Sequence, residues 1–123
     1  MNTLLGLRTA IYPAPDLARA KAWYTQVLHR APHFDEAFYV GFDVGGFELG
    51  LLPNATPGTT GPQPMWGVAD ANATYAHLLA LGASALEPVK DVGGGIKVAA
   101  VTDPFGNRLG IIENPLFDVK KVR

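Results

Sequence analysis

The chain has 123 residues, enough for one domain with a buried core, and its 48% hydrophobic and 17% charged residues indicate a folded chain. A net charge of −1 and the lack of a long apolar run argue against nucleic acid and membrane partners, so we expect a cytoplasmic protein. The absence of cysteine excludes disulfides, thiolate metal sites and a cysteine nucleophile.

The first half of the chain predicts a strand, a helix and further strands. Residues 4–12 are rich in apolar and β-forming types, which favours a strand. Asp16 is a candidate N-cap, and apolar residues recur at helical spacing from Leu17 to Leu28. The strands that follow are residues 33–44 and 47–53, with the two-residue turn Gly45-Gly46 between them.

The second half repeats this order after a loop at residues 54–62. Residues 64–68 predict a short strand and Asp70 a second N-cap. The second helix has a buried stripe of apolar residues and ends at Gly82. The stripe consists of Ala71, Tyr75, Leu78 and Leu79, and the last three strands are residues 85–89, 96–102 and 108–113.

The two halves also share a hairpin sequence. Residues 43–54 (DVGGFELGLLPN) align with residues 103–114 (DPFGNRLGIIEN) at Asp, Gly, Leu, Gly and Asn. We therefore expect an α+β fold of two βαβββ modules, residues 4–54 and 62–114. The modules would form a curved mixed sheet or open barrel with the helices outside and a cleft inside.

The stretches PDLARAKAWYTQVL and DPFGNRLGII, set in paired βαβββ modules, resemble the vicinal oxygen chelate superfamily. That superfamily includes glyoxalase I, bleomycin-resistance proteins and extradiol dioxygenases. The resemblance covers nearly the whole chain and implies a single domain, residues 1–123. It also implies a ligand cleft and assembly as a homodimer.

Catalytic members hold a divalent metal with His, Gln or Glu on the first and last strands of each module. The resemblance carries these four positions onto Thr9, Gly50, Gln63 and Gly110. Glycine has no side-chain donor, and one glutamine amide does not hold a divalent cation. We therefore expect no metal and no other cofactor, and no catalytic residue can be named.

Strand alternation predicts which side chains share the cleft face. Glu48 has the same parity as Gly50 and could be either a displaced metal ligand or an ion-pair partner of Arg108. Glu113 has the opposite parity to Gly110. The parity of Phe38, Tyr39 and Phe42 stays open, and His29, His33 and His77 are expected at the surface. The predicted cleft residues are Thr9, Ile11, Glu48, Gly50, Leu52, Gln63, Met65, Gly67, Arg108, Gly110 and Ile112.

The residues predict a protein that binds a small apolar or aromatic ligand without a metal. The first alternative is a metal-dependent lyase or isomerase of glyoxalase type, or a dioxygenase, with Gln63 and Glu48 as displaced ligands. A metal-free enzyme with Glu48 as base and a structural or regulatory dimer with no ligand also remain open, because a fold does not determine a function.

Overall fold

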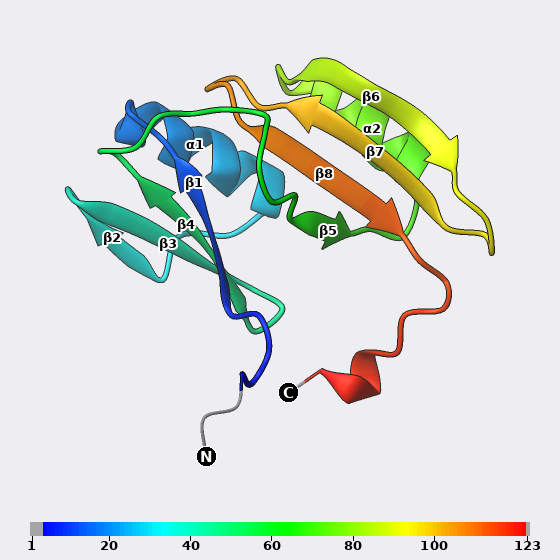
Figure 1. Ribbon diagram of the computed structural model, residues 1–123. Helices are drawn as coiled ribbons and strands as arrows, with labels where there is room; N and C mark the ends of the chain where they lie inside the picture. The colour runs from blue at the N-terminus through cyan, green and yellow to red at the C-terminus, as the bar shows by residue number, and fades with distance from the viewer. Residues whose placement is uncertain (1–3, 123) are drawn as a thin grey trace. The chain divides into compact units, whose positions relative to one another are not determined.

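A computed structural model describes residues 4–122, which form two helices, eight strands and one short 3₁₀ helix (Figure 1). The chain divides into two compact units, one that runs to Thr56 and takes in the segment from Asp118, and a second from Pro57 to Phe117. Neither helix is long and apolar enough to cross a membrane. The elements are β1 (Thr9–Pro13), α1 (Leu17–Leu28), β2 (Phe34–Glu36), β3 (Tyr39–Val44), β4 (Phe47–Leu52), β5 (Met65–Gly67), α2 (Ala71–Ala80), β6 (Ser84–Asp91), β7 (Lys97–Thr102), β8 (Arg108–Glu113) and η1 (Val119–Lys121).

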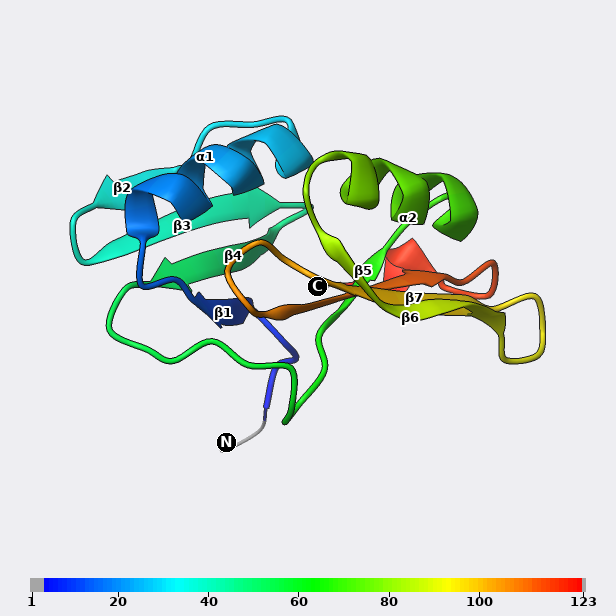
Figure 2. The ribbon, with the colours of Figure 1, turned by 90° about the horizontal axis from the view of Figure 1, so that it is seen from above.

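The first unit holds one four-stranded mixed sheet in the order β1-β4-β3-β2. Strand β1 runs parallel to β4, and the other pairs are antiparallel. The β3–β4 hairpin closes at Gly45 and Gly46, whose φ angles of 60° and 88° suit a two-residue turn. Helix α1 begins where the Asp16 carboxylate accepts the Arg19 N–H at 3.3 Å, and it lies along one face of this sheet (Figure 2).

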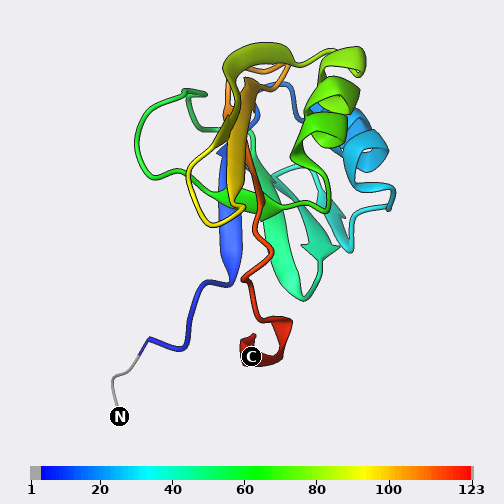
Figure 3. The same cartoon turned by 90° about the vertical axis from the view of Figure 1, so that its right-hand side faces the viewer.

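The second unit repeats the arrangement, with a four-stranded sheet in the order β5-β8-β7-β6. Helix α2 packs against this sheet (Figure 3). Two of its N-terminal N–H groups have side-chain acceptors. The Asp70 carboxylate accepts the Ala73 N–H at 3.0 Å, and the Glu113 carboxylate accepts the Ala71 N–H at 2.8 Å. The α+β class and the two βαβββ modules are confirmed, and each module has its own sheet.

The core of each unit lies between its helix and the facing side of its sheet. In the first unit Tyr12, Leu49, Leu51 and Phe42 are buried, and Tyr24 packs edge-on against Tyr12 with ring centroids 6.0 Å apart. Leu78 of α2 is buried as predicted. Leu79, which the sequence placed in the same stripe, is 37% exposed and therefore lies outside the core.

The DPFGN stretch is a structural turn. Asp103 is only 3% exposed, and its Oδ1 accepts the N–H groups of Phe105 at 2.9 Å and Asn107 at 2.8 Å. The buried Asn107 side chain in turn accepts the Gly58 N–H at 3.4 Å. This motif therefore positions the start of β8, and the Asp103 and Asn107 side chains serve as hydrogen-bond acceptors for backbone N–H groups.

Candidate functional site

The predicted residues of the first module share one face of their sheet. Cross-strand pairing puts Thr9 beside Glu48 and Ile11 beside Gly50 in the parallel β1–β4 ladder. Partners in a ladder project to the same side, so these residues and Leu52 lie on the face opposite the buried core. We call this side the open face of the first sheet. Ile11 is 55% exposed there, whereas Tyr12 next to it is 4% exposed.

Two polar side chains, those of Tyr39 and His33, contact the Glu48 carboxylate on this open face. Tyr39 at the start of β3 donates its hydroxyl to Glu48 Oε1 at 2.6 Å. His33, which precedes β2, places Nε2 at 2.7 Å from Glu48 Oε2. Because an ionised carboxylate only accepts hydrogen bonds, His33 Nε2 must carry the proton that it shares. We refer to Tyr39, Glu48 and His33 as the Glu48 cluster.

The Glu48 cluster lies over two glycines that face each other across the β3–β4 ladder, Gly41 and Gly50. A Cβ at Gly50 would collide with the Tyr39 hydroxyl and stand 2.5 Å from its Cζ. A Cβ at Gly41 would stand 2.7 Å from Glu48 Oε2 and 3.2 Å from His33 Nε2. Both glycines are therefore needed for the cluster to lie flat on the sheet. The Tyr39 side chain therefore fills the space above Gly50.

Tyr39 and Glu48 have defined protonation states at neutral pH. Burial, followed by the hydrogen bond to Glu48 and its charge, raises the pKa of Tyr39 to about 12. The Tyr39 hydrogen bond lowers the pKa of Glu48 and outweighs burial, and His33 contributes in the same direction. Tyr39 is thus a neutral donor and Glu48 a carboxylate with 26% of its side chain exposed.

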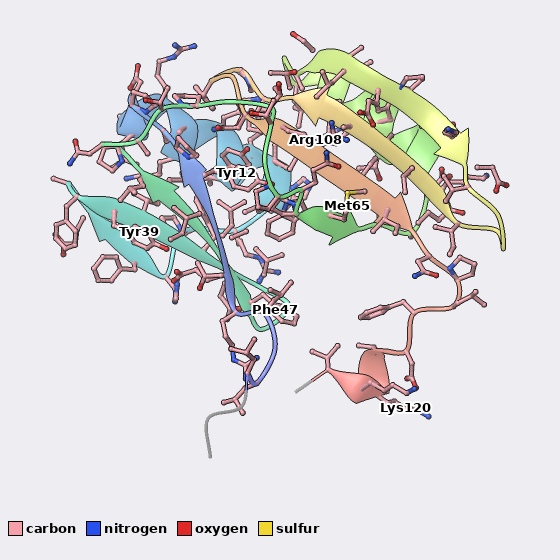
Figure 4. All side chains as sticks on the ribbon, viewed as in Figure 1. Tyr12, Tyr39, Phe47, Met65, Arg108 and Lys120 are labelled. Carbon is pink, nitrogen blue, oxygen red and sulfur yellow. The ribbon has the colours of Figure 1, made fainter. Side chains whose placement is uncertain are left out.

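The second module repeats this filling with a different side chain. Met65 of β5 pairs with Gly110 of β8, and a Cβ at Gly110 would stand 2.8 Å from Met65 Sδ and 3.1 Å from the Pro64 carbonyl oxygen. Figure 4 labels Met65 on β5 and Tyr39 on β3. The two related glycines therefore admit a thioether in one module and a phenol in the other.

Arg108 on β8 forms a two-pronged ion pair within the second module. Its Nη1 and Nη2 donate to Glu87 Oε1 at 3.0 Å and Oε2 at 2.9 Å, and its Nε is buried without a hydrogen-bond partner among residues 4–122. Glu87 raises the pKa of Arg108, and Arg108 lowers that of Glu87. The sequence suggested Arg108 as a partner for Glu48. Instead, each is paired inside its own module.

The remaining predicted residues of the second module divide into two groups. Gly67 and Ile112 pair across the β5–β8 ladder, and Met65, Gly110 and Arg108 share their parity, so these five lie on one side of the second sheet. Gln63 precedes β5 and is exposed. The single cleft that the sequence places between the two modules stays a prediction.

The donors at the four ligand positions do not fit a divalent metal. Thr9 and Gln63 offer a hydroxyl and an amide, while Gly50 and Gly110 offer nothing. The groups that occupy the glycine positions are a phenol with a pKa of about 12 and a soft thioether, which are poor ligands for hard cations. Residues 4–122 contain no group of three or more His, Cys, Asp or Glu side chains arranged to hold a metal.

The aromatic residues whose parity the sequence left open lie in three different environments. Phe42 is fully buried on the core side, and Phe38 lies in the β2–β3 turn with 64% of its surface exposed. Tyr39 and Phe34 lie on the open face, with ring centroids 6.1 Å apart. The sequence missed Phe34 and also missed His33, which was expected only as a surface residue.

Comparisons with known proteins agree with this architecture. The family model described as "Glyoxalase/Bleomycin resistance protein/Dioxygenase superfamily" matches residues 6–111. No curated protein matches the sequence.

Several solved structures share the fold at low sequence identity. A glyoxalase-related enzyme from Fulvimarina pelagi superposes with a TM-score of 0.77 at 19% identity, covering 97% of this chain and 95% of that one. A superfamily member from Sphaerobacter thermophilus gives a TM-score of 0.74 at 18% identity, covering 90% and 98%. The bleomycin resistance determinant encoded on transposon Tn5 gives 0.69 at 22% identity, covering 90% and 99%. Similarity at this level establishes the fold alone.

Proposed function

This chain belongs to the glyoxalase/bleomycin resistance protein/dioxygenase superfamily, and from that membership we propose that it binds a small molecule without using a catalytic metal. The observation that supports the proposal most directly is the position of Tyr39. Its hydroxyl fills the place that a side chain at Gly50 would take, and Met65 does the same at Gly110. Two of the four expected ligand positions are thus packed with side chains that hold divalent metals poorly.

The open face of the first sheet is the proposed binding surface. Ile11, Phe34 and Phe38 are 55%, 41% and 64% exposed, and they surround the polar Glu48 cluster. Ligand sites commonly combine a mostly apolar surface with a few fixed polar groups. Because Tyr39 and His33 hold the Glu48 carboxylate from both oxygens, its position is set before any ligand arrives.

Acid–base catalysis by Glu48 is less well supported. A general base works best when its pKa lies near the working pH, and Tyr39 and His33 lower the pKa of Glu48 instead. A lowered pKa makes Glu48 a better counter-ion than base.

We also propose that the chain works as a homodimer in the cytoplasm. Large apolar side chains are exposed in the segments before β1 and after β8, among them Leu4, Leu7 and Leu116 at 96%, 86% and 72%. Such surfaces often mark contacts with a partner. Sedimentation velocity checks this part, and a monomer across the micromolar range would contradict it.

Metal content tests the central proposal. The untagged protein is incubated in turn with Ni²⁺, Zn²⁺, Fe²⁺ and Mn²⁺, dialysed, and analysed by mass spectrometry, with His33→Ala as a matched variant. We expect far less than one metal per chain. About one metal per chain in both proteins would overturn the proposal, while a trace that disappears in His33→Ala would be adventitious binding at the exposed imidazole.

Ligand binding is tested by thermal shift against a broad library of small molecules. We expect stabilisation by compounds with an apolar or aromatic part, because binding to the folded state raises its stability by mass action. If no compound raises the melting temperature, the binding function is contradicted.

A further inference from the structure

The open face of the first sheet has a one-sided charge pattern. Pairing in the sheet places three carboxylates on it, those of Glu36, Asp43 and Glu48. No lysine or arginine occupies an open-face position on β1 to β4. Two arginines flank the strands: the Arg30 guanidinium donates to the Asp43 carbonyl oxygen at 2.7 Å, and that of Arg8, just before β1, donates to the Leu7 carbonyl oxygen at 3.1 Å. The electrostatic potential of this face therefore favours a positively charged ligand.

One aromatic ring, that of Tyr39, contacts the carboxylate, and two more adjoin it. The rings of Phe34 and Phe38 meet edge to face with centroids 5.9 Å apart, and Tyr39 joins them through Phe34 at 6.1 Å. Tyr39 reaches from this aromatic group to Glu48, to which its hydroxyl is bonded. Phe38 and Phe34 are exposed, so their rings are available for stacking or cation–π contact.

From these two features, and resting on the proposed binding function, we propose that the open face of the first sheet binds a small organic cation with an aromatic part, of the arylalkylamine type. The ammonium group hydrogen-bonds the Glu48 carboxylate, and the aromatic part of the ligand packs on Phe34 and Phe38. A carboxylate ligand would meet three like charges.

In this proposal the Glu48 carboxylate, held in place by Tyr39 and His33, favours a charged ammonium over a neutral donor. Both oxygens of Glu48 already accept one hydrogen bond each, from Tyr39 and from His33, yet a quarter of the side chain is exposed. A carboxylate oxygen can accept a second bond, and a charge-assisted bond from an ammonium is stronger than one from a neutral hydroxyl. The preference for a cation over a neutral analogue then comes from Glu48, while the aromatic rings bind both.

Three compounds with one ring and one linker separate these contributions: 2-phenylethylamine, 2-phenylethanol and phenylacetate. Their binding to the full chain is measured at pH 7 by titration calorimetry and by amide chemical shifts. We expect the amine to bind about tenfold more tightly than the alcohol, with phenylacetate weakest. Equal binding of amine and alcohol, or tighter binding of phenylacetate, would overturn the proposal.

Matched variants test the assignment to Glu48. Glu48→Gln should weaken amine binding about tenfold and leave the alcohol within about twofold. Asp35→Asn is the control, because it removes one carboxylate from the same sheet on the other face, where Asp35 pairs with Lys21 at 2.7 Å. Amine binding that survives Glu48→Gln, or that falls equally in Asp35→Asn, contradicts the site.

Two further outcomes distinguish this proposal from the function on which it rests. If Glu48→Gln does not fold, Phe38→Ala replaces it, because Phe38 is an exposed turn residue. This variant should weaken the binding of both the amine and the alcohol.

If none of the three compounds binds but the library yields another ligand, the cation proposal fails and the binding function stands. If no library compound binds either, both fail.

Discussion

The contact between Tyr39 and Gly50 is the feature on which most of these conclusions depend, and Gly50→Ala tests it directly. The added Cβ would stand 2.5 Å from Tyr39 Cζ and 2.9 Å from Cε1, far inside an ordinary contact of about 3.5–4.0 Å. Tyr39 is a half-buried side chain, so the cheapest response is for its ring to swing away from the sheet. That movement breaks its 2.6 Å hydrogen bond to Glu48.

The cost follows from two opposing terms. Losing a hydrogen bond to a charged group costs about 1.5–3 kcal/mol, and we take about 1.5–2 because water partly replaces the partner. Replacing glycine by alanine in ordinary strand backbone stabilises by about 0.4–1 kcal/mol. The net loss is about 1 kcal/mol. For a chain of this length it corresponds to a fall in melting temperature of about 4 °C.

The control is Gly67→Ala, because a Cβ at Gly67 meets nothing within 4 Å. Its melting temperature should stay level or rise by about 2–4 °C. In a Tyr39→Ala background the cost of Gly50→Ala should disappear, giving a coupling energy of about 1.5–2 kcal/mol. Differential scanning calorimetry measures the wild type, the three single variants and the double variant. If Gly50→Ala is as stable as Gly67→Ala, Tyr39 does not lie over Gly50 and the account of the filled ligand position is wrong.

Three more predictions concern ionisation and the repeated turn. Ultraviolet titration should find one tyrosine ionising near pH 12, and Glu48→Gln should bring that pKa down only partway because burial is the largest cause. Since folding holds the pKa of Glu48 below 4.5, its carboxylate stabilises the protein above about that pH and the contribution is lost as the pH falls through the folded-state pKa; Glu48→Gln should thus melt below wild type at pH 7 and converge with it as the pH falls below that folded-state pKa. Asp103→Ala should cost about 2–4 kcal/mol in urea unfolding, against less than about 1 for Asp43→Ala, whose carboxylate is exposed and accepts the Gly46 N–H. Equal costs for the two would contradict the role assigned to the buried turn.

Much of the fold could be predicted because its signals are local. Asp16 and Asp70 begin the two helices as N-caps, and the Gly45-Gly46 turn joins β3 to β4. Burial of Leu49 and Leu51 beside the exposed side of β4 follows from alternation alone. These features depend on residues a few positions apart, where propensity and periodicity are reliable.

The Glu48 cluster depends on longer-range pairing, yet one signal for it was available. A two-residue turn at Gly45 and Gly46 fixes the register of the hairpin, which sets Gly41 opposite Gly50 and places Tyr39 diagonal to Gly50. An aromatic ring diagonal to a glycine often covers it. The possibility of bulges left the parity of Tyr39 open, but the irregularities in pairing occur in β6–β7 and not in β3–β4.

His33 could not be assigned from sequence by the same argument. It lies outside the strands, 15 positions from Glu48. Its ring reaches the carboxylate because the backbone N–H of His33 donates to the Gly41 carbonyl oxygen at 2.9 Å. That bond sets the path of the chain into β2. No periodicity or spacing of histidines carries such information.

Tyr39 and Met65 change what a glycine at a ligand position means in this fold. An empty position could regain a ligand by one substitution, because a carboxylate would enter free space. Here the side chain of Tyr39 occupies that space over Gly50, and Met65 occupies it over Gly110. A restored carboxylate would have to displace a half-buried ring that holds Glu48, or a thioether that packs on β8. A carboxylate could therefore return to either position only with a second change that moves the side chain lying over it.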